Sequence, residues 1–173
     1  MPVASGTGST PRERLEQLYL ECRDDVYAYV ATMLADRALA EEVTAAAFER
    51  AFRRRSLYDA RRGSERAWLF GIARNAALDE LRRRRRRAAL AAEIPDAAPP
   101  EQEDHSDGTL RRAAVQAALA GLAPRERELI ALKFHAGLGN AEIARVLRVS
   151  ESNAGTMLHR AITKLREACD EAA

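Results

Sequence analysis

The residues best suited to chemistry in this 173-residue chain are arginines, and their spacing favours binding over catalysis. Arginine carries a planar fork of N–H donors that matches phosphate oxygens. Six consecutive arginines occupy positions 82–87. From position 74 into the start of this run, polar side chains recur at helical spacing, namely Arg74, Asn75, Asp79, Arg82 and Arg83. Such a face can contact the phosphates and base edges of nucleic acid, and the alternative is a merely solvated helix end.

Catalytic and metal-binding arrangements are not expected. The three histidines do not cluster with cysteines or paired acids at catalytic or metal-ligand spacing, and the sequence has no glycine-rich phosphate loop. Cys22 and Cys169 lie far apart without CxxC spacing, so we expect reduced, buried thiols rather than a disulfide or metal site. The sequence therefore predicts a protein that is not an enzyme and needs no metal or other cofactor.

The charge is divided into three blocks that the net charge of +2 conceals. Residues 1–87 carry 18 basic and 13 acidic side chains, and residues 88–110 carry six acidic side chains with no Lys or Arg. Residues 111–173 carry 10 basic and 7 acidic side chains. Cationic blocks gain free energy by displacing counterions from phosphates, so two basic blocks joined by an acidic one favour a nucleic-acid partner.

The elements that position these charges are predicted to be helices. Only 5% of residues are aromatic, so a core must be built mainly from Ala, Leu, Val and Ile. We expect an all-α fold of two small helical domains joined by a flexible acidic linker. The predicted segments are a disordered tail (1–12), a first module (13–87), a proline-containing linker (88–109) and a second module (110–173). No apolar run approaches a membrane span or a secretory signal, which predicts a cytoplasmic protein.

In the first module, apolar residues from Leu15 to Met33 recur every three or four positions, which predicts a long helix. Asp36 and Ser64 are suited to cap the next two helices. Between those helices lies a polar loop at 59–66. Trp68 at the start of the third helix is expected in the core, with stacking on an exposed base as the alternative.

The second module carries the pattern of a helix-turn-helix. Thr109 can cap a short helix ending at Gly121, and Pro124 can begin the next. A helix over 140–147, a three-residue turn and a longer helix capped by Ser150 then follow. The outward face of that last helix would present Ser152, Asn153, Thr156, His159 and Arg160 to a major groove. An ordinary helical hairpin is the alternative.

Four segments in this order resemble the bacterial RNA polymerase sigma factors, in their smallest two-domain form, the extracytoplasmic-function (ECF) group. The segments are AEEVTAAAFERAF, WLFGIARNAALDELRRRRR, LAPRERELIALKF and AEIARVLRVSESNAGTMLHRA. The resemblance covers about residues 13–87 and 110–169. It implies a specificity subunit that binds core RNA polymerase, reads the -10 and -35 promoter elements and stabilises melted DNA. Relatives of this kind are often held inactive by an anti-sigma protein, which makes such a protein a possible partner.

The resemblance also implies roles for individual residues. The polymerase surface would be formed or supported by Glu41, Glu42, Phe48 and Arg50. The -10 and melting contacts would come from Arg61, Arg62, Ser64, Arg66, Trp68, Arg74, Asn75, Asp79, Arg82 and Arg83. The -35 contacts would come from Arg148, Ser150, Ser152, Asn153, Thr156 and Arg160.

The sequence departs from the family pattern at five positions. Ala45 and Ala46 replace a usual Gln-Glu pair, which removes polar contacts to polymerase. Gly155 and Met157 stand where Lys and Arg are common, and Arg148 replaces the usual turn glycine. Fewer cations would weaken phosphate contacts at the -35 element. Two alternatives to a sigma factor are a stand-alone helix-turn-helix regulator and a degenerate sigma-like adaptor.

Overall fold

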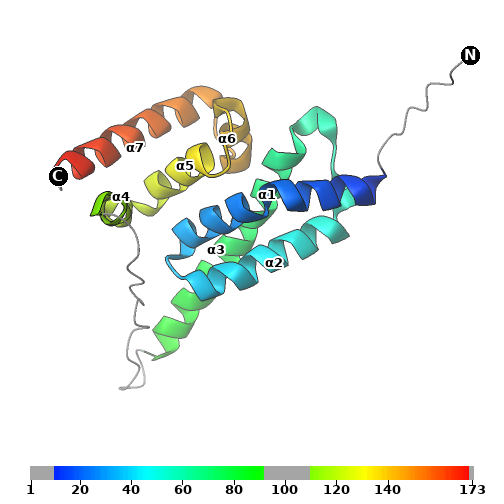
Figure 1. Ribbon diagram of the computed structural model, residues 1–173, viewed down its shortest axis with the longest axis horizontal. Coiled ribbons are helices and arrows are strands. Elements are labelled where there is room, and N and C mark those ends of the chain that lie inside the picture. The colour runs from blue at the N-terminus through cyan, green and yellow to red at the C-terminus, as the bar shows by residue number, and fades with distance from the viewer. Residues whose placement is uncertain (1–9, 92–109, 172–173) are drawn as a thin grey trace, which may run out of the picture.

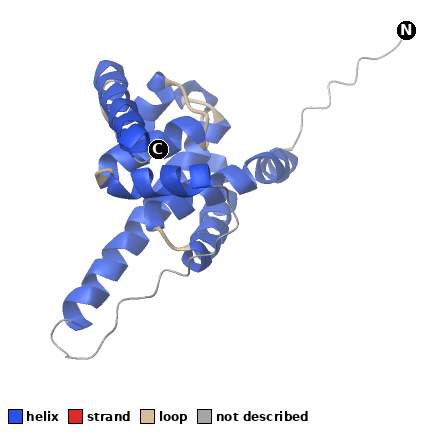
Figure 2. Cartoon of the chain, turned by 60° about the vertical axis from the view of Figure 1, so that its left-hand side comes forward, coloured by secondary structure: helices blue, strands red, loops and turns tan. Residues whose placement is uncertain are grey.

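The computed structural model describes residues 10–91 and 110–171, and every regular element in these two stretches is a helix (Figure 2). The helices are α1 (Pro11–Leu34), α2 (Arg37–Arg53), α3 (Glu65–Ala91), α4 (Leu110–Gly121), α5 (Pro124–Phe134), α6 (Asn140–Leu147) and α7 (Glu151–Glu171). Two single 3-10 turns, Arg55–Leu57 and Ala60–Arg62, lie between α2 and α3. The predicted all-α fold is confirmed. Residues 1–9 of the predicted tail, the cap at Thr109 and most of the predicted linker lie outside the described residues. Pro11 and Arg12, which were assigned to the disordered tail, instead begin α1, because Thr10 and Glu13 cap its start.

Helices α1, α2 and α3 pack together as the first module (Figure 1). The periodic apolar positions of α1 are buried, with Val26, Tyr29 and Val30 fully inaccessible to solvent. Both predicted caps are present. The Asp36 carboxylate accepts the Leu39 N–H at 2.9 Å, and Ser64 Oγ accepts the Ala67 N–H at 3.1 Å. These caps satisfy amide groups that would otherwise lack a partner at the helix starts.

Helix α3 continues to Ala91, so residues 88–91 are helical although the sequence analysis assigned them to the linker. The arginine run stays helical because neighbouring acids neutralise part of its charge. Arg84 binds the Asp36 carboxylate at 2.5 Å and the Leu34 carbonyl at 3.0 Å, which ties it to the α1–α2 turn. Alanine, the strongest helix former, then occupies three of the four added positions.

Helices α4 to α7 form the second module, and α6 and α7 form the predicted helix-turn-helix. Ile143 and Leu147 of α6 and Leu158 of α7 are buried, as their spacing predicts. Ser150 Oγ accepts the Asn153 N–H at 3.2 Å and so caps α7. Arg148 ends α6 in the left-handed conformation, with φ of 56°, where a glycine would be unstrained.

The two modules pack against each other, which the sequence analysis did not predict. Helix α5 lies against α1, and α6 lies against α3 (Figure 1). One continuous cluster of buried apolar side chains includes Val26 and Phe70 of the first module and Leu129 and Leu132 of the second. The two modules therefore share a core, to which the fully buried Ala136 also contributes, while Leu122, Ile130 and Ala161 form a smaller cluster within the second module.

Changing Gly155 to Ala is expected to raise the free energy of unfolding by about 0.5–1 kcal/mol, because glycine is costly inside a helix. A Cβ at this position would lie 3.4 Å from Asn140 Nδ2, the end of a side chain that can move slightly. Urea unfolding monitored by circular dichroism measures the change.

The matched control is Gly137→Ala, which should be destabilising. Gly137 has a φ of 64°, and alanine in that left-handed conformation costs roughly 1–2 kcal/mol. Equal effects of the two substitutions would contradict the contrast between Gly155 inside helix α7 and Gly137 in the left-handed conformation.

Candidate nucleic-acid interface

The loop before α3 presents two of the predicted -10 residues to solvent. Arg61 and Arg62 are exposed on the turn Ala60–Arg62, which the Asp59 carboxylate caps by accepting the Arg61 N–H at 3.0 Å. The Tyr58 hydroxyl donates to the Gly63 carbonyl at 3.1 Å. Trp68 is half-buried and its ring lies 5.6 Å from that of Tyr58. The loop is thus held in place by its own hydrogen bonds, and Arg61 and Arg62 form no ion pair with any side chain of residues 10–91 or 110–171.

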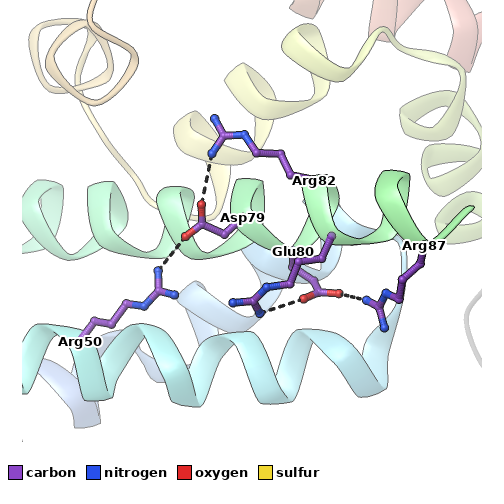
Figure 3. A network of polar contacts seen from close by, with 6 residues as sticks. Arg50, Asp79, Glu80, Arg82 and Arg87 are labelled. Atoms are coloured by element: carbon purple, nitrogen blue, oxygen red, sulfur yellow. Dashed lines mark hydrogen bonds and ion pairs between the residues drawn. The ribbon is translucent and has the colours of Figure 1, made fainter. Parts of the chain in front are cut away.

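Along α3, the arginines do not project independently, because neighbouring carboxylates pair with them and hold them in place (Figure 3). Asp79 accepts hydrogen bonds from Arg50 of α2 and from Arg82, each at 3.2 Å. Glu80 is buried between α3 and α2 and binds Arg87 at 2.5 Å and Arg83 at 3.4 Å. The guanidinium ends of Arg82 and Arg83 remain exposed. This end of α3 therefore offers fixed cations, as the sequence analysis expects of a DNA-binding face.

Arg74 does not share that exposed face. Its side chain is only 18% exposed, and its Nε lies 2.5 Å from Oε1 of Glu128 in α5. Glu128 is 4% exposed and also accepts a hydrogen bond from Arg125 at 2.8 Å. Arg74 is turned away from the face predicted for it because it pairs with the buried carboxylate of Glu128.

Arg66 is also engaged between the modules. Its Nε donates to the Ala136 carbonyl at 2.5 Å, and its Nη2 donates to the His135 carbonyl at 3.2 Å and to Asp25 at 2.5 Å. Its Nη1 lies 3.1 Å from Cys22 Sγ. Four of the five N–H donors of this guanidinium are therefore used.

A further cross-module hydrogen bond runs from the Ser64 hydroxyl to the Glu142 carboxylate at the start of α6. Ser64 therefore both caps α3 and contacts the second module. Together with Arg66 and Arg74, it is one of three predicted -10 residues that contact the second module. Asn75, the residue after Arg74, is exposed.

The cysteines are free thiols, but they differ in burial. Cys22 is buried, and burial raises the pKa of its thiol above the usual value although Arg66 opposes the shift. Cys169 is only half-buried, so the predicted burial is wrong for this residue. It lies in the last turns of α7, where fewer neighbouring helices cover the side chain.

The predicted -35 residues gather at the start of α7. Ser152, Asn153, Thr156 and Arg160 are all exposed there, and Arg148 is exposed in the preceding turn. The Ser150 hydroxyl is used in capping α7. Met157 is half-buried against the core and Gly155 faces Asn140, so these two positions do not extend the outward face.

On α2, Glu41 and Glu42 are exposed, as expected of a partner-binding surface. Phe48 is 8% exposed and packs edge-on against Tyr19, with ring centroids 4.8 Å apart. A side chain this buried supports the helix surface and does not itself contact a partner. Arg50 reaches Asp79 of α3 and joins the two helices. Ala45 is exposed and Ala46 half-buried on the same helix.

Sequence reasoning missed an apolar groove between α1 and α2. It is lined by Arg12, Leu15, Glu16, Tyr19, Leu20, Phe48, Glu49 and Phe52. Leu20 is 76% exposed and Phe52 is 46% exposed. Leu20 and Phe52 lie outside the apolar stripes by which their helices face the core. Large apolar residues at such outward positions were the sequence feature that could have indicated the groove.

The sequence analysis also did not identify the residues that complete the contact between the modules, which are Glu128, Glu142, His135 and Asp25. Within residues 10–91 and 110–171, no group of three or more His, Cys, Asp or Glu side chains could hold a metal ion. No helix in that part of the chain has the length and apolar character of a membrane span.

Two family descriptions match the chain in succession, Sigma-70 region 2 over residues 18–87 and Sigma-70 region 4 over residues 112–165. The RNA polymerase sigma factor CarQ of Myxococcus xanthus is 34% identical over 162 residues, covering 92% of this chain and 91% of that protein. The ECF RNA polymerase sigma factor BldN of Streptomyces coelicolor is 34% identical over 152 residues, covering 86% of this chain and 58% of that protein. The chain thus spans little more than half of the Streptomyces relative.

Among solved structures, the sigma factor RpoE of Bartonella quintana in complex with the anti-sigma factor NepR has the same fold. The TM-score is 0.71 at 20% identity, covering 91% of this chain and 97% of that one. At 20% identity, this similarity supports the fold alone.

Acidification is expected to destabilise the fold through His135. Burial lowers the pKa of its imidazole below the usual 6.5, and the nearby Asp25 carboxylate partly opposes the shift. The ring Nε2 lies 3.2 Å from Thr32 Oγ1 across the module contact. A depressed folded-state pKa means that the stabilisation is present above pH 6.5 and is lost as the pH falls through the folded-state value.

The measurement compares melting temperatures at about pH 8 and about pH 5 in the wild type and in His135→Gln. The substitution should reduce the loss of stability on acidification. His159→Gln, at an exposed position of α7, is the matched control. An identical pH dependence in the wild type and His135→Gln would remove His135 from this role.

Proposed function

Because the chain belongs to the ECF group of RNA polymerase sigma factors, we propose that it binds core RNA polymerase and directs initiation at specific promoters. The observation that carries the proposal is the succession of region 2 and region 4 along one chain. A stand-alone helix-turn-helix regulator would need only the second of these. The first module would bind polymerase and read and melt the -10 element, and the second would read the -35 element.

In the first module, Arg61 and Arg62 would contact the displaced strand, while Arg82 and Arg83 hold its backbone. Strand opening costs a few kcal/mol per unstacked base, so a protein without an energy source must capture extruded bases as they appear. The fixed exposed guanidiniums at the end of α3 support this assignment, because an oriented donor loses less freedom on binding. Asn75 would add an amide contact to a base edge.

In the second module, the start of α7 would enter the major groove. Ser152, Asn153 and Thr156 offer short hydrogen-bonding groups there, and Arg160 lies one turn further along the same helix. Arg148 in the preceding turn would contact a phosphate. Ser150 would act by capping the helix, whose free N–H groups then point toward the DNA backbone.

The polymerase would dock on the exposed face of α2, with Glu41 and Glu42 as charged contacts and Phe48 and Arg50 as supports. A factor that works on polymerase acts where the chromosome lies, in the cytoplasm, and its role is binding without catalysis. The Bartonella relative was solved with an anti-sigma factor. By analogy, we propose a protein of that kind as a further partner of this chain.

The direct test is reconstitution with core RNA polymerase on fragmented genomic DNA of the source organism, followed by sequencing of transcript 5′ ends. We expect starts that depend on this protein and share two upstream sequence elements. DNA binding without polymerase association would favour the stand-alone regulator. Polymerase association without any specific starts would favour the adaptor.

Replacing Arg82 and Arg83 together by Ala should lower the rate of open-complex formation by roughly tenfold or more, because each lost phosphate contact also weakens binding. The fold should be unaffected, because the ion pairs of Glu80 with Arg87 and of Asp79 with Arg50 remain in the variant. Fluorescence of 2-aminopurine in the melted segment follows opening.

The matched control replaces Arg12 and Arg23, two exposed arginines of α1 that also pair with nearby acids. It removes the same charge at a site with no assigned DNA contact. Equal losses in the two double variants would indicate a general charge effect and contradict the assignment of α3.

A further inference from the structure

The six arginines at positions 82–87 lie on different sides of α3. Successive residues of an α-helix point about 100° apart, so a run of six surrounds the helix and one member has to face the bundle. That member is Arg84, which lies one turn after the buried Glu80. Only 30% of the Arg84 side chain is exposed, against 65% for Arg82 and 67% for Arg87. Arg84 therefore continues the buried face of α3 to the edge of the bundle.

Arg84 is bound by acceptors that belong to the ends of two other helices. Its Nη1 donates to the Leu34 carbonyl at 3.0 Å, in the last turn of α1, and its Nη2 donates to Asp36 Oδ2 at 2.5 Å. The other oxygen of that carboxylate accepts the Leu39 N–H and caps α2. One guanidinium therefore joins the end of α1, the start of α2 and the body of α3. We call this set of contacts the α3 anchor.

The turn between α1 and α2 lacks a cation of its own. The last carbonyls of an α-helix have no helical partner and carry partial negative charge, and α1 has no basic residue in its last turn. Arg84 supplies that charge from another helix. A planar fork satisfies the carbonyl and the carboxylate with two different nitrogens, whereas lysine presents a single nitrogen. The geometry of the α3 anchor is therefore specific to arginine.

We propose that Arg84 is a positioning residue and not a DNA contact, because it fixes the projecting end of α3 to the α1–α2 turn and thereby holds Arg82 and Arg83 in place for the melted strand. The inference rests on the proposed function, which assigns Arg82 and Arg83 to DNA. Within residues 10–91 and 110–171, the hydrogen bonds of Arg84 are the ones that join the arginine run to another helix. Beyond this point α3 extends away from the bundle (Figure 2).

Two fixed points are needed to set the direction of a helix. Glu80 orients Arg83, but both residues belong to α3 and move with it. Asp79 gives the first fixed point, because it accepts a hydrogen bond from Arg50 of α2 at 3.2 Å. Arg84 gives the second, five residues or about 7–8 Å further along the axis. Without Arg84, the end of α3 that carries the proposed DNA contacts would be held at one point only.

The test removes each half of the α3 anchor in the full chain. Asp36→Asn keeps an oxygen that caps α2, because asparagine caps helices about as well as aspartate, and it removes the charge that holds Arg84. All six arginines remain in that variant. Arg84→Ala removes the fork itself. With core RNA polymerase and a promoter identified by transcript mapping, each substitution should slow open-complex formation several-fold. The double variant should be no slower than the slower single variant, since both changes remove one interaction.

The salt dependence of promoter binding separates a positioning residue from a DNA contact. The slope of log affinity against log salt concentration should stay at the wild-type value in Asp36→Asn and Arg84→Ala, because Arg82 and Arg83 remain. Loss of a phosphate contact would reduce the slope by about 0.9. Arg84→Lys keeps the charge without the fork and should open the promoter as slowly as Arg84→Ala. A reduced slope in Arg84→Ala, or wild-type opening rates in Asp36→Asn or Arg84→Lys, would overturn the positioning role.

Hydrogen exchange in the free chain measures the anchor without polymerase or DNA. Exchange of the backbone amides of residues 82–91, followed by mass spectrometry, should accelerate several-fold in Arg84→Ala and Asp36→Asn, because the end of α3 opens more easily. Arg86→Ala is the comparison variant. Arg86 is exposed and forms no ion pair with the described residues, so its loss removes the same charge without a contact to another helix. Its exchange should match the wild type.

Unchanged exchange in both Arg84→Ala and Asp36→Asn, or equal acceleration in Arg86→Ala, would overturn the α3 anchor. Should Arg84→Ala fail to melt cooperatively, Arg84→Lys and Asp36→Asn decide the question. Faster exchange in these variants, with no promoter opening by the wild-type chain, would support the anchor and overturn the proposed function. Normal opening by the wild type, with unchanged exchange in the variants, would do the reverse.

Discussion

A guanidinium group cannot be removed from water without partners for its N–H donors, and this constraint organises the contact between the two modules. Arg66 and Arg74 lie where α1 and α3 meet the second module, and each is supplied with carboxylate or carbonyl acceptors. Buried ion pairs of this kind contribute little net stability, because desolvation offsets the attraction. Their effect is to fix one relative placement of the helices, since any other placement would leave charges unpaired.

The same constraint acts along the exposed end of α3. Like charges at neighbouring helix positions repel, and the run at 82–87 would strain an isolated helix. Asp79 and Glu80 lie one turn before the run. Asp79 forms an ion pair with Arg82, and Glu80 forms ion pairs with Arg83 and Arg87. The helix therefore tolerates a high density of cations while leaving their ends accessible. In a sigma factor, a high density of accessible cations favours association with a polyanion such as DNA.

Much of the fold followed from periodicity and capping, because these depend on residues close together in the chain. The spacing of apolar residues in α1, the caps Asp36 and Ser64, and the turn before α7 are local features that a sequence carries directly. The placement of the predicted -35 residues on an exposed face followed from the same periodicity.

The contact between modules depends on pairs more than 50 positions apart. Glu128 in PRERELIALKF has the appearance of an ordinary surface acid, and its burial requires the arginine at position 74. Phe48, which was expected to form or support the polymerase surface, and Met157, which stands where a cation is common in the family, both pack against the core. The contact of Arg84 with Asp36, the cap of another helix, likewise joins residues 48 positions apart.

Helix α3 runs unbroken for 27 residues and projects beyond the bundle, a length of about 40 Å (Figure 2). Its near end holds Arg66 and its far end the arginine cluster, so both belong to one stiff rod. Force applied by a strand at the tip would be carried to the base with little bending. DNA bound at the tip and the second module at the base would therefore act on one and the same rod.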